Sequence, residues 1–475
     1  MRANLRIRVD SIGCRLNISE VEEMARRFTS AGHRLVGPGE VADLYVFNTC
    51  TVTHIAARKS RQVIRQMRRA NLQARVVVTG CYAQLSPDEM KALGVDMIVS
   101  NDQKDNLPDL LAEAGFLQDA DPIPAVDEVE CGAMLTLPQS ALLKPGHTRA
   151  FVKVQDGCDN RCSFCIVTLA RGAGRSRPVA DVIAEINRLT GLGYQEAVLS
   201  GVHLGAYGYD WAAPQGRGDR RGLHNLVQAI LAETGLPRLR LSSLEPWDLA
   251  EDFFELWQNE RLLPHLHLPL QSGCDATLRR MARSTTQAQF SRLVEMAHAA
   301  IPDLSVTTDI MVGFPGETDA EFNESLAFVR EMAFAKLHIF RYSRREGTAA
   351  AKMKDQVPAS VAQERSRQMH ALNAELERAF RQKLIGRTMP VLWESSEPFG
   401  FDLQWSGLTN NYARVITHTT SDVDLRNQVI ETDLVDLAPA ALMGQLPPPL
   451  TISQSSGMRI ETRIPNLITY SPEAV

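Results

Sequence analysis

The chain is organised around the stretch Gly157-Cys158-Asp159-Asn160-Arg161-Cys162-Ser163-Phe164-Cys165, whose cysteines are spaced C-x3-C-x2-C. Thiolates are soft ligands that suit iron–sulfur clusters, and three of them leave one iron of a 4Fe-4S cluster open for a small molecule. Zinc requires a fourth protein ligand, yet no Cys or His follows within the next twenty residues and His147 is isolated upstream. A trio of buried free thiols is the alternative, which such close spacing disfavours.

This nonapeptide, with the aromatic Phe164 before its last cysteine, resembles the signature of the radical S-adenosylmethionine superfamily. The resemblance implies that Cys158, Cys162 and Cys165 bind a 4Fe-4S cluster. Its open iron would chelate the amino and carboxylate groups of S-adenosylmethionine. Reductive cleavage of that cofactor would then give a 5′-deoxyadenosyl radical.

The overall composition is that of an ordinary globular protein, with 475 residues, 44% hydrophobic and 23% charged. This length predicts two to four domains. The first ten residues alternate apolar and charged side chains, which indicates a strand and not a signal peptide, and no apolar run is long enough to span a bilayer. The cysteines occur in patterns typical of metal sites and not of disulfides, which favours a location in the reducing cytoplasm. The net charge of −5 argues against a uniformly basic nucleic-acid-binding protein but allows a local basic face.

Residues 1–116 alternate strands and helices, which predicts a small α/β domain with a mostly parallel sheet. One helix is expected over Ser19–Ser30, and strands are expected at Leu5–Val9, Leu44–Asn48, Val76–Thr79 and Met97–Val99. Cys14, Cys50 and Cys81 each lie at the end of such a strand or in the loop after it. Ligands bind outside the carboxyl ends of strands in open α/β sheets, so the three thiols are predicted to converge. Three unrelated core cysteines are the alternative.

The segments around these cysteines resemble the three cysteine motifs in the amino-terminal domain of methylthiotransferases. They read Gly13-Cys14, Asn48-Thr49-Cys50 and Gly80-Cys81-Tyr82-Ala83-Gln84. The resemblance implies a second 4Fe-4S cluster with Cys14, Cys50 and Cys81 as its ligands. Cys131 and Cys274 match no motif and are interpreted as plain thiols.

The helix expected after Cys50 carries only cationic charge, at positions that include Arg58, Lys59, Arg61 and Arg65. Such a run is often just a solvated face, but it also suits contact with a phosphate backbone. The sequence of residues 48–54 and 58–62 resembles that of one branch of the family, which modifies threonylcarbamoyladenosine next to the tRNA anticodon.

Residues 117–147 contain several prolines and are predicted to be a linker, followed by a second α/β domain over residues 148–384. Its strands are expected at Phe151–Val154, Ala197–Ser200, Arg238–Ser242, His265–Leu268, Ser305–Met311 and Lys336–Phe340. This alternation fits either an α/β barrel or a doubly wound sheet. The superfamily resemblance implies a partial, six-strand α/β barrel.

Four residues at these strand ends match motifs that contact S-adenosylmethionine in the superfamily. Gly201 lies in a loop that resembles the one near the methionine amino group, although the usual acidic residue is absent. Ser243 and Gln271 match positions that bond the ribose or carboxylate, and Asp309 is implied to point into the barrel. Ordinary capping of strand ends is the alternative for each of them.

The carboxy-terminal third of the chain contains candidate RNA-binding segments. His338–Ala349 matches the last strand-end motif of the family, in which Arg344 and Arg345 would meet an anionic backbone, with surface solvation as the alternative. A helix is expected over residues 358–384. Residues 385–450 alternate short strands at Met389–Trp393, Leu403–Trp405, Tyr412–Val415 and Val429–Thr432, which predicts a small antiparallel β-barrel. They resemble the TRAM domain, an OB-like RNA-binding β-barrel, with Gly407–Tyr412 similar to its inner motif but with few Lys or Arg. Residues 451–475 are predicted to be a tail.

In combination, these resemblances indicate an enzyme that converts threonylcarbamoyladenosine of tRNA to its 2-methylthio derivative. They imply two 4Fe-4S clusters, S-adenosylmethionine used both as methyl donor and as radical source, and a flipped target base. The implied partners are a tRNA substrate, an electron donor and a sulfur source, and no membrane. The alternatives are methylthiolation of isopentenyladenosine in tRNA or of a ribosomal-protein aspartate, or a non-catalytic RNA-binding protein with structural zinc.

Overall fold

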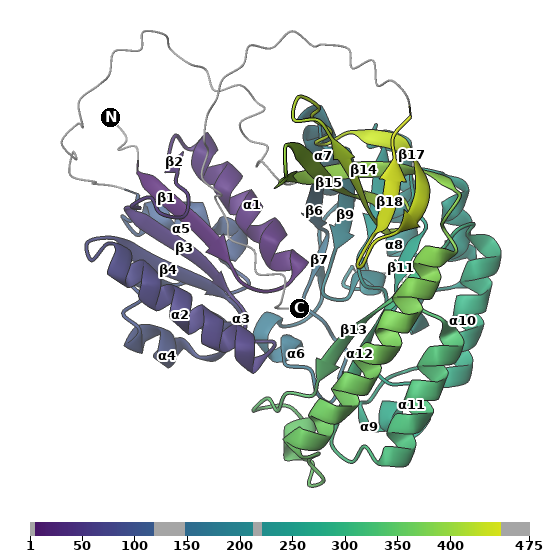
Figure 1. Cartoon of the computed structure of the whole chain (residues 1–475). Helices are drawn as coiled ribbons and strands as arrows, with labels where there is room; N and C mark the ends of the chain where they lie inside the picture. Colours follow the sequence, from purple (N-terminus) through teal and green to yellow (C-terminus); the bar gives the residue numbers. More distant parts are fainter. Residues whose placement is uncertain (1–4, 118–147, 212–220, 448–475) are drawn as a thin grey trace. The chain divides into compact units, whose positions relative to one another are not determined.

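The computed structural model describes residues 5–117, 148–211 and 221–447, which form two compact units (Figure 1). The described part of the amino-terminal unit consists of residues 5–117 together with 166–172. The carboxy-terminal unit consists of 148–165, 173–211 and 221–447. The linker predicted at 117–147 and the tail predicted at 451–475 lie, apart from residue 117, outside the described residues, as does Cys131.

The amino-terminal unit is built on a parallel five-stranded sheet with the order β2-β1-β3-β4-β5. Its strands are β1 (Arg6–Ser11), β2 (Arg34–Leu35), β3 (Leu44–Thr49), β4 (Arg75–Gly80) and β5 (Met97–Ile98). Its helices are α1 (Arg15–Ser30), α2 (His54–Ala70), α3 (Cys81–Leu85), α4 (Pro87–Ala92), η1 (Lys104–Asn106), α5 (Leu107–Glu113) and α6 (Val167–Arg171). The predicted α/β alternation is therefore present.

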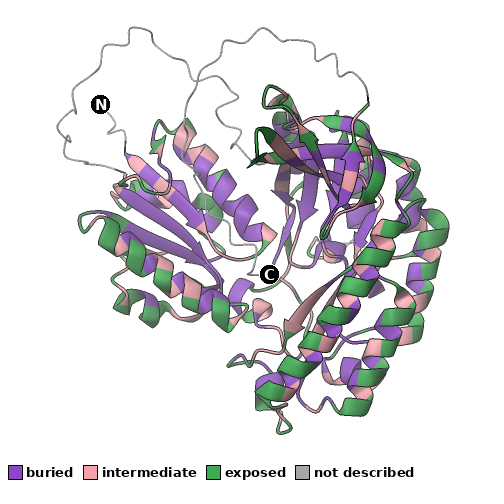
Figure 2. Cartoon of the chain, viewed as in Figure 1, coloured by how far each residue is buried: buried purple, intermediate pink, exposed green. Residues whose placement is uncertain are grey.

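Helices cover both faces of this sheet, because the central strands are apolar on both sides. Every residue of β3 is buried, as expected for a parallel strand between two helical layers. One core cluster joins the sheet to Ile64 and Met67 of α2, and a second joins it to Phe28 of α1 and Leu111 of α5. Figure 2 shows the buried strands between helices whose outer faces are exposed.

The α/β part of the carboxy-terminal unit contains the six strands that the sequence predicted. They are β6 (Arg149–Lys153), β9 (Glu196–Ser200), β10 (Arg238–Leu241), β11 (His265–His267), β12 (Ser305–Val312) and β13 (Lys336–Arg341). Parallel ladders join them into two sheets of three, β10-β9-β6 and β11-β12-β13. Single parallel bridges, Leu239 to Leu262 and Ser243 to His267, link the β10 and β11 regions. All six carboxyl ends therefore run in one direction.

Helices and short elements connect these strands. The helices are α7 (Val179–Gly191), α8 (Gly222–Glu233), α9 (Asp275–Arg280), α10 (Gln287–Ala300), α11 (Asp319–Met332) and α12 (Ala359–Gln382). The 3-10 turns are η3 (Leu204–Ala206), η4 (Pro246–Asp248), η5 (Glu251–Gln258) and η6 (Ala350–Lys352), and β7 (Gln155–Asp156) pairs antiparallel with β8 (Arg175–Ser176). The helices α10 and α11 both begin with capping boxes, at Thr286 and Thr318, which satisfy their first backbone N–H groups.

The last part of the unit is a closed barrel with the strand order β14-β15-β16-β18-β17. The predicted antiparallel pairing holds for all of its pairs except β16 and β18, which are parallel because β17 pairs with both β14 and β18 and so separates β18 from β16 in the chain. Its strands are β14 (Thr388–Phe399), β15 (Asp402–Thr409), β16 (Arg414–Thr419), β17 (Val429–Leu437) and β18 (Leu442–Gln445). Trp393 and Trp405 fill its core. A side chain at Gly407 would place its Cβ 2.7 Å from the Leu392 carbonyl, so only glycine allows β14 and β15 to approach this closely.

A buried charge network joins this small barrel to the amino ends of β6, β9 and β10. Glu196 is fully buried and pairs with Arg149 at 2.8 Å and with Arg238 and Arg240 at 3.0 Å each. Arg240 also donates to the Asn410 carbonyl at 3.1 Å. Tyr412, in the left-handed region at φ 72°, lies between the Arg240 guanidinium at 4.4 Å and the His265 ring at 4.7 Å. The segment Gly407–Tyr412 thus fastens the small barrel to the α/β part.

Candidate active site

Three thiols gather at the carboxyl end of the amino-terminal sheet. Cys14 is the N-cap of α1 directly after β1, Cys50 follows β3, and Cys81 is the first residue of α3 after β4. The strand order reverses between β1 and β3, and such a topological switch point is where open α/β sheets bind ligands. Chain topology alone therefore brings Cys14 and Cys50 to a binding position.

Two glycines are required for the backbone to bring these cysteines together. Gly13 has a φ of 129°, and a Cβ at this position would lie 2.9 Å from the Cys50 Cβ and 3.1 Å from its Sγ. Gly80 has a φ of 94°, and its Cβ would lie 2.3 Å from Asn48 Oδ1. Any other residue would be strained in this region and would displace the site.

Cys50 and Cys81 are buried, whereas Cys14 is exposed, and the three thiols are electrostatically coupled. Burial, with smaller contributions from the charges of Cys14 and Cys81, raises the pKa of Cys50 to about 12. Burial also raises the pKa of Cys81, and the positive charge of Arg171 opposes the rise. The protonated forms of Cys50 and Cys81 are thus favoured until a metal ion displaces their protons, which is how thiol ligands of metals behave.

A buried polar network that sequence reasoning missed surrounds this set. Glu20 accepts from Lys104 at 2.6 Å and from Arg171 at 3.0 Å, and Arg171 also donates to Asn17 Oδ1 at 2.8 Å. Asn48 donates to the other Glu20 oxygen at 2.8 Å. Lys104 and Arg171 carry two positive charges and Glu20 one negative charge, so this network has a net positive charge next to the thiols. That charge would stabilise an anionic cluster held by thiolates.

The second thiol set, Cys158, Cys162 and Cys165, lies in the loop after β7 and is partly exposed. Gln155 organises the entry of this loop, since its Nε2 donates to the Gly157 carbonyl at 2.8 Å while its Oε1 accepts from the His203 backbone at 2.9 Å. A Cβ at Gly201 would lie 3.2 Å from the Cβ of Gln155. Gly201 therefore allows this close packing, and its predicted contact with the cofactor stays a prediction.

The middle of the loop is anchored through Ser163. Its hydroxyl donates to the Arg280 carbonyl at 2.8 Å, and its backbone N–H donates to the Met281 carbonyl at 2.9 Å. The next residue, Phe164, contacts Phe314 edge-on with ring centroids 6.4 Å apart. These contacts hold the cysteine loop against the carboxyl ends of the sheet.

Arg283 is a positioning residue of this site that the sequence did not reveal. Its guanidinium bonds both oxygens of Glu245, at 3.0 and 2.6 Å, lies over Trp247 at 4.5 Å and approaches Cys162 Sγ at 3.8 Å. Burial raises the pKa of Cys162, and the charge of Arg283 opposes this rise. Arg283 therefore stabilises the thiolate form of Cys162.

His203 and Asp248 form a second buried pair beside the loop. His203 Nε2 lies 2.5 Å from Asp248 Oδ2, and its Nδ1 lies 3.4 Å from the amide of Asn160. Burial lowers the pKa of His203, but hydrogen bonds to Asp248 and Cys158 outweigh it and raise the pKa to about 10. The loop after β9 carries no acidic residue, as noted from sequence, and the nearby carboxylate comes instead from η4.

The other predicted cofactor residues lie on the same edge of the sheets. Ser243 forms a bridge with His267. Gln271 occupies the left-handed region at φ 73° and exchanges backbone hydrogen bonds with Asp309 and Met311, each at 2.8 Å. Such strain in a non-glycine residue, of about 1–3 kcal/mol, is often found at binding sites. The roles of Ser243, Gln271 and Asp309 stay predictions.

The predicted RNA-binding cations differ in their surroundings. Arg58 and Arg65 are exposed on α2, and Lys59 is half-buried there. Arg61 is held by the Tyr82 hydroxyl at 2.5 Å and by Glu89 at 3.7 Å. Contact of these side chains with RNA stays a prediction. Arg58 and Arg65 are the most accessible of them.

The two arginines after β13 also differ from each other. Arg344 is exposed, whereas Arg345 is buried with 8% of its surface accessible. Contact of either with RNA stays a prediction, and the burial of Arg345 favours an internal role.

Both donor sets consist of cysteine thiols, and thiolates are the usual ligands of iron–sulfur clusters. Among the described residues, no three side chains of His, Cys, Asp or Glu are arranged to share one metal ion. A 4Fe-4S cluster instead places each thiolate on a different iron. Cys274, buried and bonded to Glu324 at 3.2 Å, belongs to neither set.

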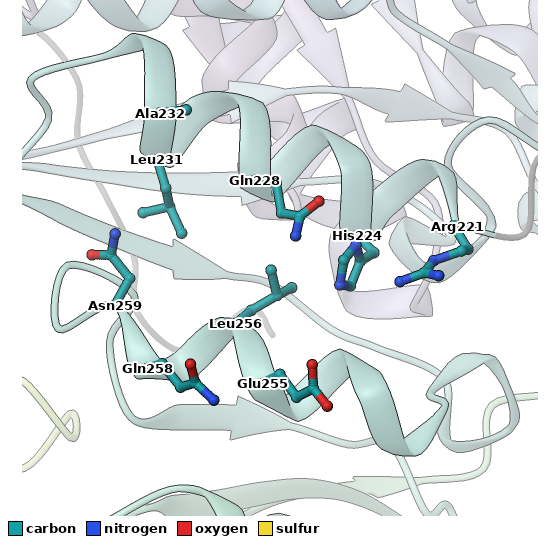
Figure 3. Close-up of a pocket in the computed structure, with 9 residues that line it drawn as sticks. All are labelled: Arg221, His224, Gln228, Leu231, Ala232, Glu255, Leu256, Gln258 and Asn259. Atoms are coloured by element: carbon teal, nitrogen blue, oxygen red, sulfur yellow. The ribbon is translucent and has the colours of Figure 1, made fainter.

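A separate cavity of about 500 Å³ lies between α8 and η5 (Figure 3). Polar side chains, including Arg221, Gln228 and Glu255, point into it. None of the thiols or predicted cofactor residues lines it, so it is not part of the candidate active site. None of the described helices combines the length and apolar character needed to cross a membrane.

Comparison with known proteins identifies the family. Residues 6–100 match the family described as "Uncharacterized protein family UPF0004", and residues 152–329 match the "Radical SAM superfamily". The chain is 36% identical over 419 residues to threonylcarbamoyladenosine tRNA methylthiotransferase MtaB of Bacillus subtilis, covering 87% of this chain and 90% of the relative. The chain belongs to the radical S-adenosylmethionine tRNA methylthiotransferases.

Other relatives of this methylthiotransferase carry a different substrate in their names. It is 33% identical over 443 residues to tRNA-2-methylthio-N(6)-dimethylallyladenosine synthase of Novosphingobium aromaticivorans, covering 92% of this chain and 97% of the relative. A solved radical S-adenosylmethionine methyltransferase, TsrM from Kitasatospora setae, matches with a TM-score of 0.53 at 15% identity, over 73% of this chain and 77% of that one. The structural likeness supports the fold alone.

Membership settles the class of cofactor. The methylthiotransferase is a radical S-adenosylmethionine enzyme, and its family carries two 4Fe-4S clusters. The structure contains two separate sets of three thiols, each at the carboxyl end of a parallel sheet. Their number and chemistry fit the two clusters.

Proposed function

We propose that this enzyme adds a methylthio group to C2 of N6-threonylcarbamoyladenosine next to the anticodon of tRNA. The observation that carries the reaction class is the pair of thiol triads within one chain. The choice of substrate is supported by the MtaB relatives, at 36% identity in Bacillus subtilis and 37% in Thermotoga maritima. The dimethylallyl synthases, at 33–36%, make isopentenyladenosine the second candidate.

In this proposal each triad holds one cluster. Cys158, Cys162 and Cys165 would hold the cluster that, with S-adenosylmethionine, supplies the radical, and Cys14, Cys50 and Cys81 would hold the cluster that carries sulfur. The protein contributes placement and charge. Arg283 favours the thiolate of Cys162, and Gly201, Ser243, Gln271 and Asp309 would surround the cofactor.

We further infer that the two three-stranded sheets are the partial α/β barrel of the superfamily and that the closed small barrel is a TRAM domain. The span from β14 to β18 carries two arginines and eight carboxylates. This balance is unfavourable for binding phosphates. The cationic face of α2, with Arg58 and Arg65 exposed, is the better candidate for contact with the tRNA backbone.

The proposed function is tested by mass spectrometry of nucleosides from bulk tRNA, with and without the gene, and after complementation with the Cys158→Ala enzyme. Selective loss of 2-methylthio-threonylcarbamoyladenosine, restored by the wild-type gene but not by the variant, is the expected result. Selective loss of 2-methylthio-isopentenyladenosine instead would show that isopentenyladenosine is the substrate. No change in any tRNA nucleoside would contradict the proposal.

A further inference from the structure

The cysteine loop of the radical-forming site lies on a small apolar core. Met281, Phe314 and Ala350 form this core and are fully buried, and Phe164 of the loop packs against them. The rings of Phe164 and Phe314 meet edge-on with their centroids 6.4 Å apart. Phe164 directly precedes Cys165 in the chain, so the position of Phe314 affects the position of a predicted cluster ligand.

Phe314 belongs to a turn that follows β12 and passes close to α12. Gly313, the first residue after the strand, has a φ of 74°, and a Cβ there would lie 2.6 Å from the Cβ of Ala362 in α12. Glycine allows both this backbone conformation and this close approach, but it is also the most flexible residue. The turn that carries Phe314 therefore needs a further contact to fix it.

A buried carboxylate supplies this contact. Glu317 Oε2 accepts from the Gly313 N–H at 2.6 Å, and the Glu317 N–H donates to the Phe314 carbonyl at 2.9 Å. Burial raises the pKa of Glu317, whereas the Gly313 N–H and the charge of Arg365 oppose this rise. The ionised carboxylate, which is the stronger acceptor, thus depends on these partners.

Arg365 of α12 is a cation that faces this carboxylate. Its Nη1 donates to Glu317 Oε2 at 2.8 Å and to the Glu317 carbonyl at 3.0 Å, and its Nη2 donates to Asp319 Oδ1 at 2.7 Å. The side chains of Arg365 and Glu317 are only 6% and 2% exposed. Removing one partner of a buried ion pair leaves the other charge uncompensated. Without Arg365, Glu317 would take up a proton or turn away, and its hold on the turn would weaken.

We propose that Arg365 is a positioning residue of the radical-forming site. It holds Glu317, which holds the turn at Gly313, and this turn keeps Phe314 against the cysteine loop. The inference rests on the proposed function, because it takes the cysteine triad of this loop as the holder of the cluster that binds S-adenosylmethionine.

Three variants of the full-length enzyme separate this role from a general effect of substitution. Arg365→Met removes the charge and keeps most of the length of the side chain. The double variant Arg365→Met/Glu317→Gln also removes the facing charge and keeps an amide oxygen as acceptor for the Gly313 N–H. Replacing both partners of a buried pair is often nearly neutral. The control Arg367→Met removes an arginine of the same helix whose side chain is 72% exposed and pairs with Glu364.

Two measurements on the anaerobic holoenzyme follow the turn and the cofactor site. A hydrogen bond to a charged group corresponds to about 10- to 100-fold in an equilibrium constant, so hydrogen–deuterium exchange of residues 311–318 should accelerate by this factor in Arg365→Met. Exchange of residues 158–166 should also accelerate, and the Kd for S-adenosylmethionine should rise by about tenfold or more. The double variant should bring the Kd to within about fivefold of the wild type, and Arg367→Met should change neither quantity.

The outcomes distinguish failure of this inference from failure of the proposed function. Faster exchange of the turn with an unchanged Kd, or equal values in Arg365→Met and Arg367→Met, would overturn the inference while the proposed function stands. If Arg365→Met does not fold, Arg365→Lys keeps the charge but loses the planar fork of donors, and a smaller rise in Kd is expected; an unchanged Kd would again overturn the inference. If replacing Cys158, Cys162 and Cys165 by alanine leaves the Kd for S-adenosylmethionine unchanged, both are wrong.

Discussion

Replacing the buried carboxylate of Glu20 by a neutral amide should strongly lower the free energy of unfolding of the amino-terminal unit, because the substitution removes a charge and little else. Glu20 and Lys104 have no exposed side-chain surface and lie 2.6 Å apart, and Arg171 is 3.0 Å away. Glu20→Gln preserves the size and one acceptor oxygen of the side chain but leaves two buried cations without their counter-charge. Removing one partner of a buried ion pair costs about 3–5 kcal/mol.

A matched control lies one turn further along the same helix. Glu23 is 49% exposed and pairs with Arg26 at 2.6 Å, and an exposed pair of this kind contributes about 1 kcal/mol or less. Glu23→Gln therefore removes the same charge from the same helix at little cost. The difference between the two variants isolates the effect of burial.

Hydrogen–deuterium exchange resolves this effect by unit. The opening free energy of β3 and β4 should fall by about 3–5 kcal/mol in Glu20→Gln, which accelerates exchange of their amides by at least about 100-fold. Peptides from β12 serve as an internal reference in the other unit, and their exchange should not change. Equal exchange of β3 and β4 in Glu20→Gln and Glu23→Gln would refute the reasoning.

Three further predictions concern charge elsewhere in the chain. Burial raises the pKa of Glu196, but Arg240, Arg149 and Arg238 outweigh it and hold the pKa well below 4.5. The stabilisation from ionised Glu196 is thus complete above pH 4.5 and is lost as the pH falls below that value. In urea titrations, the difference in free energy of unfolding between the wild type and Glu196→Gln should therefore shrink from pH 7 to pH 3.5. A difference that stays constant over this range would contradict the prediction. In filter-binding assays, the double variant Arg58→Ala/Arg65→Ala should reduce the slope of log K against log salt for tRNA by about 1.4–1.8, whereas an unchanged slope would remove α2 from the RNA-binding face. Arg171→Met should lower the reduction potential of the amino-terminal cluster by roughly 50–100 mV, because a cation next to Cys81 is lost. Redox titrations followed by electron paramagnetic resonance measure this potential. An unchanged or raised potential would contradict the placement of a cluster beside Arg171.

The element pattern was largely predictable from the sequence, because period and turn residues are local signals. The expected helix at 358–384 is α12 at Ala359–Gln382, and the strand expected at Ser305–Met311 is β12 at Ser305–Val312. The strand β18 was missed. Its four residues Leu442–Gln445 contain a glycine and are too short to show alternation.

The thiol sets were also predictable, since the cysteines of the amino-terminal set follow neighbouring parallel strands and so lie at one edge of the sheet, and those of the second set share one short loop. The residues around them were not. Arg171 is 151 residues from Glu20, and Arg283 is 121 residues from Cys162, so no local pattern links them. Similarly, the sequence of α2 shows a uniform row of cations, but the fold pairs Arg61 with Glu89 and Arg68 with Asp96. Long-range pairing decides which cations remain available for a ligand.

The most direct test of the account is the iron and acid-labile sulfide content of the anaerobically purified enzyme. The wild-type enzyme should hold about eight irons per chain, in two clusters of about four. Replacing Cys14, Cys50 and Cys81 together by alanine should remove about four, and replacing Cys158, Cys162 and Cys165 should remove the other four. A wild-type enzyme with about four irons, or a triple variant that keeps all eight, would contradict the assignment of one cluster to each triad.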